Sequence, residues 1–303
     1  MDDEILNLIW ARKMAWSHAA DRLGANIGRA RALLLALGCV GAVFETLAAT
    51  AFARDEAVRT ASAAAGSVCL AVATYVGSQW LTGAATRAWT LSRSVSEALK
   101  AEFYLCRARC GPYAADDRAA LLNAKTAEIE EAGADLAAQL AAAAPGGEAP
   151  PGDLDQAAYV ATRVMGQVSR YLRPTAQRYA RRVGLLRALA IGCGGLATVI
   201  GAVAACLSAT PGWGGSDSGL AAWVAVLTTI GASIGAYISE KRYDFLILAY
   251  VNSARRLETL ANEWRAHAGR MDQPSWDMFV RSCEDVIAGT NQSWMAKLMQ
   301  PGA

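Results

Sequence analysis

The residue with the clearest potential for chemistry is Glu45, a carboxylate inside a long apolar stretch. A charge at the centre of a membrane-spanning helix costs about 2.5–3.5 kcal/mol on insertion scales, so it should face protein or water. Gly41 and Ala48 share its helical face, which is a small-residue stripe that lets helices approach closely. Two interpretations stay open. Either several copies of Glu45 line a pore and select cations, or a protonated Glu45 bonds a neighbouring helix and serves assembly only.

Four more small or polar residues in apolar runs are candidates for a pore wall or a helix interface. Gly231 and Gly235 form a small-xxx-small pair next to Thr228, and Thr74 lies in a second apolar run. Because such pairs are frequent in apolar sequence, helix packing is the simpler interpretation.

Two arginine pairs lie close to apolar runs. Arg181 and Arg182 precede one run, and Arg255 and Arg256 follow another. Such basic pairs bind either anionic lipid headgroups or a soluble nucleotide messenger, and lipid is the plainer partner.

Enzymatic and metal chemistry find little support. Cys106 and Cys110 are one helical turn apart, but the chain has only two histidines, His18 and His267, and no second cysteine pair to complete four ligands. We therefore expect no metal, no cofactor and no catalytic residues. The remaining acidic residues considered are interpreted as solvated helix faces with pairs at (i, i+4) spacing: Glu97, Glu102, Glu128, Glu258, Glu263 and Glu284.

The composition explains what would position these side chains. Of 303 residues, 54% are hydrophobic and only 18% are charged. The apolar residues gather in four runs at about 33–53, 61–81, 185–209 and 220–238. Each run is close to the ~20 residues with which a helix crosses a bilayer. The net charge of +2 gives no reason to expect a nucleic acid partner.

The runs form two hairpins, with short turns at 54–60 and 210–219. Of 29 Lys and Arg residues, only Arg54 and Arg59 fall in these turns. By the positive-inside rule, both termini and the long middle segment are cytoplasmic. The acidic start Met1–Glu4 is unlike a signal peptide, so the first span should insert uncleaved.

The two halves repeat the same order of parts. Residues 31–39 resemble 187–193, and 97–103 resemble 258–264, so the chain is a parallel tandem repeat. We divide it into a first unit at 1–112, an Ala-rich helix and Pro/Gly linker at 113–153, and a second unit at 154–303. The predicted fold is an all-α membrane protein with four transmembrane helices and long cytoplasmic helical extensions.

Several local predictions follow from helix formers and breakers. No breaker follows the second or fourth span, so both helices should continue, to about Arg109 and Ala268. A helix is expected over 116–144, a flexible linker over 145–152, a kink or break at Pro174, and an amphipathic tail helix over 275–298.

Hairpins bounded by long helices, in tandem, resemble the SLATT proteins (SMODS- and SLOG-associating two-transmembrane effectors). The resemblance rests on this architecture and on three sequence stretches: 171–187, Tyr237–Tyr243, and Glu284–Ile287 followed by Trp294. It implies an oligomeric pore former that permeabilises the inner membrane in a bacterial antiphage or conflict system. The trigger would come from a partner, either a nucleotide signal or a soluble sensor protein.

A different class of function also fits the sequence. A non-conducting scaffold would use the same long helices to recruit a soluble partner. A secondary transporter fits poorly, because the repeats are parallel and broken helices inside the spans are missing.

Overall fold

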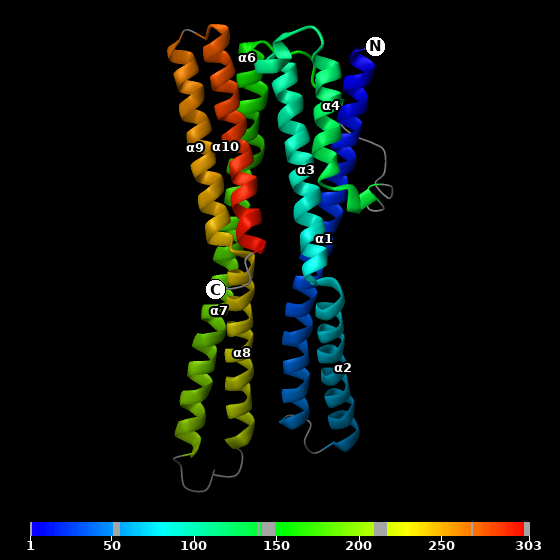
Figure 1. The fold of residues 1–303 in the computed structure, drawn as a ribbon. Coiled ribbons are helices and arrows are strands. Elements are labelled where there is room, and N and C mark those ends of the chain that lie inside the picture. Colours follow the sequence, from blue (N-terminus) through cyan, green and yellow to red (C-terminus); the bar gives the residue numbers. More distant parts are fainter. Residues whose placement is uncertain are drawn as a thin grey trace. The chain divides into compact units, whose positions relative to one another are not determined.

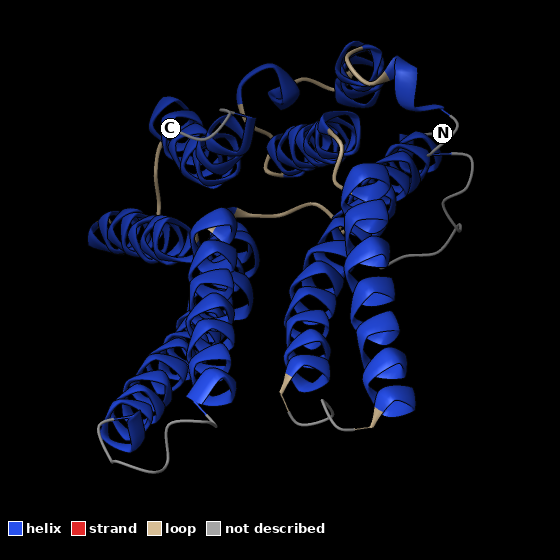
Figure 2. Cartoon of the chain, turned by 90° about the horizontal axis from the view of Figure 1, so that it is seen from below, coloured by secondary structure: helices blue, strands red, loops and turns tan. Residues whose placement is uncertain are grey.

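The computed structural model describes residues 2–50, 55–137, 140, 149–208, 217–267 and 269–299. All regular structure within these residues is helical, and Figure 2 shows no strand among them. Residues 210–216 of the second hairpin turn and residues 145–148 of the predicted Pro/Gly linker lie outside the described residues.

The helices fall into two compact units. The bundle unit comprises residues 1–25, 83–178 and 245–303, and the hairpin unit comprises 26–82 and 179–244. Each unit takes segments from both halves of the chain, so the sequence repeats themselves stay a prediction. The principal helices, labelled in Figure 1, are α1 Asp2–Ala49, α2 Glu56–Trp80, α3 Gly83–Arg107, α4 Arg118–Glu131, α6 Gln156–Ala158, α7 Arg173–Ser208, α8 Asp217–Lys241, α9 Tyr243–Ala266 and α10 Gln273–Met299.

Four helical stretches are long and apolar enough to cross a membrane, as predicted. They include α1, α2, the helical segment 156–207 that contains α7, and the segment 219–266 that contains α8. Only 6–17% of their most apolar windows is buried within the protein. Large apolar side chains such as Ile191, 75% exposed, and Val68, 60% exposed, face outwards. The chain is therefore an all-α, multi-pass membrane protein, whose exposed apolar faces require lipid.

The second helix of the first hairpin begins earlier than predicted. Residues 56–60 were expected in the turn, but α2 already begins at Glu56. The carboxylate of Asp55 accepts hydrogen bonds from the N–H groups of Ala57 and Val58, and so caps the helix.

The prediction of uninterrupted helices after the second and fourth spans was wrong. α2 ends at Trp80, and after Leu81 and Thr82 a separate helix, α3, begins. α8 ends at Lys241, and Arg242 has a φ of 49° before α9 begins. Gly83 and the β-branched Thr82 weaken the helix at the first break, but Arg242 is an ordinary helix former. Tertiary structure, and not local propensity, therefore decides the second break.

Pro174, in contrast, does not break its helix. Two π-helical segments, η3 Tyr159–Met165 and η4 Gln167–Leu172, lead directly into α7. The change from i→i+5 to i→i+4 bonding already leaves a carbonyl without an N–H partner at this junction. The missing N–H of Pro174 therefore costs little there.

The helix predicted over 116–144 is interrupted. α4 ends at Glu131, and a 3₁₀ turn, η2 Ala134–Leu136, follows. A Cβ on Gly133 would lie 2.4 Å from the ring of Trp16, so this position accepts only glycine in the present packing. The predicted tail helix over 275–298 is confirmed by α10.

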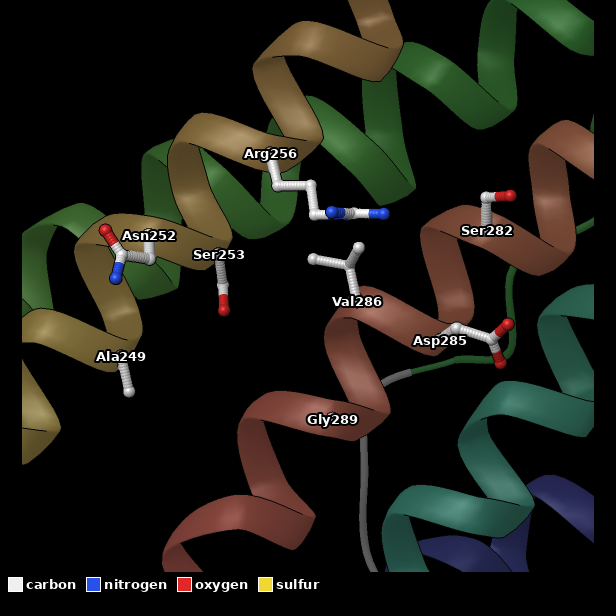
Figure 3. A pocket seen from close by; sticks show the side chains of 8 residues that line it. All are labelled: Ala249, Asn252, Ser253, Arg256, Ser282, Asp285, Val286 and Gly289. Atoms are coloured by element: carbon white, nitrogen blue, oxygen red, sulfur yellow. The ribbon is translucent and has the colours of Figure 1, made fainter.

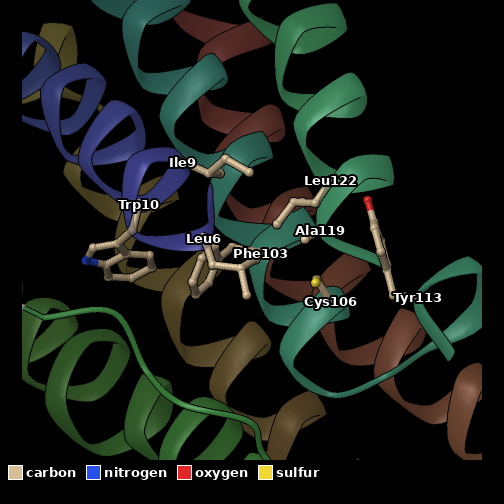
Figure 4. Close-up of a cluster of buried hydrophobic side chains, with 8 residues drawn as sticks. All are labelled: Leu6, Ile9, Trp10, Phe103, Cys106, Tyr113, Ala119 and Leu122. Atoms are coloured by element: carbon tan, nitrogen blue, oxygen red, sulfur yellow. The ribbon is translucent and has the colours of Figure 1, made fainter. Parts of the chain in front are cut away.

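The core of the bundle unit begins where α1, α3 and α4 meet. Figure 4 shows its cluster of buried side chains, in which Leu6, Trp10, Phe103 and Leu122 pack together. The Trp10 and Phe103 ring centroids are 4.8 Å apart.

The carboxylate of Asp153, at the end of the predicted linker, fixes this part of the chain to the first half. Asp153 accepts hydrogen bonds from Arg107 at 3.2 Å, Arg109 at 3.3 Å and Arg118 at 2.8 Å. The bond from Arg118 is the main cause that lowers the pKa of Asp153 to about 2. This connection therefore stays ionised at physiological pH.

The left-handed conformation at Arg242 leads to a test. Such a conformation costs an L-residue about 1–2 kcal/mol, which glycine avoids. Arg242→Gly should therefore raise the thermal unfolding temperature in detergent micelles, followed by circular dichroism. The matched control is Arg255→Gly inside α9, which should lower that temperature because interior helical glycine costs about 1 kcal/mol. Equal losses for the two variants would contradict the structure at Arg242.

Candidate functional site

Glu45 lies against α2 in the hairpin unit. The hydroxyl of Ser67 donates a hydrogen bond of 2.9 Å to Glu45 Oε1. A Cβ on Gly66 would lie 2.8 Å from the same oxygen, so glycine at this position makes room for the carboxylate. Glu45 is half-buried and Ser67 is exposed, so the pair forms a polar spot at the surface of an apolar hairpin.

The small-residue face next to Glu45 is the closest contact between α1 and α2. A Cβ on Gly41 would lie 3.0 Å from the side chain of Leu70 and 3.3 Å from the carbonyl oxygen of Gly66. Ala48 is buried on the same face, only 5% exposed. Gly41 therefore packs α1 on α2 inside one hairpin, and Glu45 is the polar group at the edge of this contact.

The other residues proposed from the apolar runs are not brought to Glu45. The hydroxyls of Thr74 and Thr228 bond carbonyl groups of their own helices. A Cβ on Gly231 would lie 3.5 Å from the carbonyl oxygen of Ala190, as expected for packing of α8 on α7, whereas Gly235 has no atom that close.

The arginine pairs lie in different units. Arg181 and Arg182 are exposed on α7, where Arg182 donates a 3.4 Å hydrogen bond to the hydroxyl of Tyr237. Arg255 and Arg256 are exposed on α9 and point to different faces.

Arg256 lines a groove between α9 and α10, drawn in Figure 3. The groove has a volume of about 460 Å³. Its other lining residues are mostly polar or small: Ala249, Asn252, Ser253, Ser282, Asp285, Val286 and Gly289.

A buried ionic cluster at the centre of the bundle unit was not predicted. Nε and Nη2 of Arg163 donate to the two oxygens of Glu284 at 2.8 and 2.5 Å. The hydroxyl of Tyr159 donates to the same carboxylate at 2.9 Å, and the Arg163 guanidinium lies 4.2 Å from the ring centre of Tyr104. The side chains of Arg163 and Glu284 are only 3% and 5% exposed. Such a two-pronged pair satisfies both charges in a dry interior.

More charge surrounds this pair on α1 and α3. Arg93 Nη2 lies 2.7 Å from Glu97, and the two neighbouring lysines, Lys13 and Lys100, have no carboxylate within ion-pair distance among the described residues. Burial and the nearby Lys100 lower the pKa of Lys13 to about 8. Burial raises the pKa of Glu97, but Arg93 and the other cations lower it further, so the net shift is downward.

The interpretation of Glu97 and Glu284 as solvated was therefore wrong. The sequence of α10 could have predicted the burial of Glu284, because this residue falls on the same helical stripe as the buried residues Val280, Cys283 and Ile287. Its partner Arg163, far away in the sequence, could not be found by spacing.

Within the described part of the chain, no three His, Cys, Asp or Glu side chains are grouped as a metal site would need. Cys106 and Cys110 are buried, and burial raises the pKa of their thiols, to about 11 and about 12. Both thiols are therefore protonated at neutral pH, unlike metal ligands.

Comparison with known families divides the chain into two matched regions. Residues 159–294 match the family of SMODS and SLOG-associating 2TM effector domain 1. Residues 14–120 match a family described as a protein of unknown function (DUF4231). No curated protein and no solved structure matches the chain. The first match confirms the resemblance seen in the sequence.

The ionic cluster should be sensitive to the loss of one partner. Glu284→Gln leaves the guanidinium of Arg163 buried without a counter-charge, which typically costs about 3–5 kcal/mol of stability. The double variant Arg163→Met, Glu284→Leu should lose much less. Unfolding in detergent measures both, and Glu4→Gln at the exposed start of α1 is the control. A double variant as unstable as Glu284→Gln would contradict this account.

Lys13 makes stability depend on pH. Its pKa is lower in the folded chain than in the unfolded chain, so the unfolded chain binds more protons between pH 8 and about 10.5. Raising the pH through this window therefore removes a destabilising charge, worth up to about 3 kcal/mol. The stability advantage of Lys13→Met over the wild type should shrink as the pH rises from 7 to 9.5, as measured by thermal unfolding. An advantage independent of pH would contradict the shift.

Proposed function

Because residues 159–294 belong to the SMODS and SLOG-associating 2TM effector family, we propose that this chain is an oligomeric, pore-forming or channel-like membrane effector. It acts in a bacterial inner membrane, as part of an antiphage or conflict system. Its role is to permeabilise that membrane on a signal from a partner, and no catalysis is required for this.

The observation that carries the proposal is the polar pair in the first hairpin. Glu45 and Ser67 sit on helices that are otherwise apolar on their surfaces. An ionisable group at membrane depth is costly, and it is typically found on the wall of a path or at a helix contact. In this hairpin the contact is with a single hydroxyl at the edge of the helix pair, so the carboxylate remains accessible to an ion or to another copy.

The pore must be built from several copies. One copy supplies four spans, which are too few to enclose a wide aqueous path, so several first hairpins would place a ring of Glu45 carboxylates around it. A ring of carboxylates favours cations over anions.

The orientation and the signal complete the proposal. Both termini and the bundle unit are cytoplasmic, because Lys and Arg residues gather at the ends of the spans away from the hairpin turns. Arg181, Arg182, Arg255 and Arg256 are candidates for contact with anionic lipid or with a nucleotide signal.

Ion flux through proteoliposomes tests this function. Purified protein should conduct in a protein-dependent manner, and Glu45→Gln should reduce the cation-over-anion permeability ratio several-fold without loss of insertion. Glu56→Gln, at the exposed end of the same hairpin, is the matched control and should leave the ratio unchanged.

Two results would count against it. An unchanged ratio in a conducting Glu45→Gln protein contradicts the role of Glu45. No flux from any variant, with or without a candidate nucleotide, favours a non-conducting scaffold that recruits a soluble partner.

A further inference from the structure

The two halves of the bundle unit use the same framework of buried positions. On α3 the residues that face inwards are Ser92, Ser96, Leu99 and Phe103, and on α9 they are Tyr250, Ala254, Leu257 and Ala261. The spacing within the two sets is identical. This makes α9 the structural equivalent of α3, in a register three residues away from the one chosen by sequence resemblance.

The next helix of each half follows the same rule. α4 buries Ala119, Leu122 and Thr126. On α10 two sets of buried residues have the same spacing, Trp276–Phe279–Cys283 and Val280–Cys283–Ile287, and the first set matches better because it begins in the first turn of its helix, as Ala119 does in α4. α10 is therefore the equivalent of α4. The chain thus contains two copies of one helix pair, α3 with α4 and α9 with α10.

These two pairs meet inside the chain through α10 and α3. The indole N–H of Trp276 donates to the carbonyl of Ala108 at 3.1 Å, and the side chain of Gln273 donates to the carbonyl of Arg109 at 3.1 Å. Further along, Ala288 of α10 and Ala101 of α3 line the same pocket. The start of α10 therefore lies at the end of α3, and the two helices pack antiparallel. Figure 1 shows the resulting order α9, α10, α3, α4.

The face of α9 that corresponds to the α10-facing side of α3 is exposed. Glu97, Ala101 and Tyr104 of α3 correspond to Arg255, Thr259 and Asn262 of α9, because each stands at the same distance from the equivalent leucine. All three α9 residues are exposed.

An apolar side chain extends the same stripe of α9. Leu248 lies seven residues before Arg255, two helical turns away on the same face, and is 59% exposed. This leucine adds apolar area to the stripe, but it is the equivalence with α3 that indicates a partner.

The corresponding face of α4 is exposed as well. Arg281, Glu284 and Ala288, which face α3 from α10, correspond to Ala124, Ala127 and Glu131 of α4. These three α4 residues are exposed, and two of them are alanines. Small side chains permit close approach of a second helix.

We propose that chains assemble head to tail, with α4 of one copy packed antiparallel on α9 of the next. This contact repeats between chains the contact that α10 makes with α3 within a chain. It rests on the oligomeric state in the proposed function and specifies the surface that builds it. Such a contact joins two different surfaces, and it builds a ring where the rotation between copies closes.

Charge supports this pairing. Because Trp276 of α10 lies beside Ala108 of α3, the antiparallel register puts Ala288 close to the level of Glu97. Carried over to the contact between copies, this register puts Glu131 of α4 close to the level of Arg255 of α9. Neither Glu131 nor Arg255 has an ion-pair partner among the described residues. An ion pair between copies would use both side chains.

The mass of the purified complex in detergent tests the interface. Arg255→Glu places two acidic side chains opposite each other, so the complex should dissociate to smaller species at protein concentrations where the wild type stays assembled. Arg256→Glu is the matched control. Its side chain lines the groove between α9 and α10, away from the proposed contact, so the mass should not change. Helical content by circular dichroism verifies folding of both variants.

Charge exchange gives the decisive result. Glu131→Arg should also dissociate the complex, and the double variant Arg255→Glu, Glu131→Arg should restore the wild-type mass. An assembled Arg255→Glu protein, or a double variant that stays dissociated, overturns the interface. Flux is measured separately on the same proteins. An assembled wild type that does not conduct would refute the pore but not the interface. A conducting wild type whose Arg255→Glu variant keeps the wild-type mass would refute the interface but not the pore.

Discussion

In the hairpin unit, the apolar side chains of four helical stretches lie mostly on the surface, and a bilayer is the medium that removes them from water. In the most apolar segment of each stretch, only 6–17% of the residues are buried within the protein. Inside hydrocarbon each backbone N–H and C=O must be satisfied within its own segment, which a helix achieves. The helices break at Leu81 and Arg242, close to where the apolar runs end. The requirement for lipid thus explains the exposed apolar faces of the spans, whereas tertiary structure decides the break at Arg242.

In the bundle unit, by contrast, the helices bury their apolar side chains against one another. Both halves place inward-facing residues at the same spacing, but they fill the positions differently. The first half packs Trp10 on Phe103, and the second buries the pair Arg163 and Glu284. A buried ion pair adds little net stability compared with apolar side chains, but its directional bonds disfavour other pairings. The ion pair therefore restricts η3 and α10 to one register, while the aromatic cluster supplies apolar burial.

The errors in the sequence predictions have a common cause. Helical periodicity and hydropathy reveal which residues form spans, because these properties are local. Burial of Glu284 depends on Arg163, which is more than a hundred residues away in the sequence. Likewise, the ring of Trp16 lies against Gly133 just beyond the end of α4, and these two residues are remote in the sequence. Local rules failed wherever a distant side chain set the environment.

The sequence by itself determined the class of this protein: the four apolar runs, the tail helix and the match of residues 159–294 to a family of two-transmembrane effector domains. These follow from length and hydropathy, which act along the chain. Only the tertiary structure decided that Glu45 meets Ser67, that lysine and arginine side chains crowd around two buried carboxylates, and that α10 lies on α3. Such contacts join residues remote in sequence, and their geometry depends on helix packing, which a hydropathy pattern does not encode.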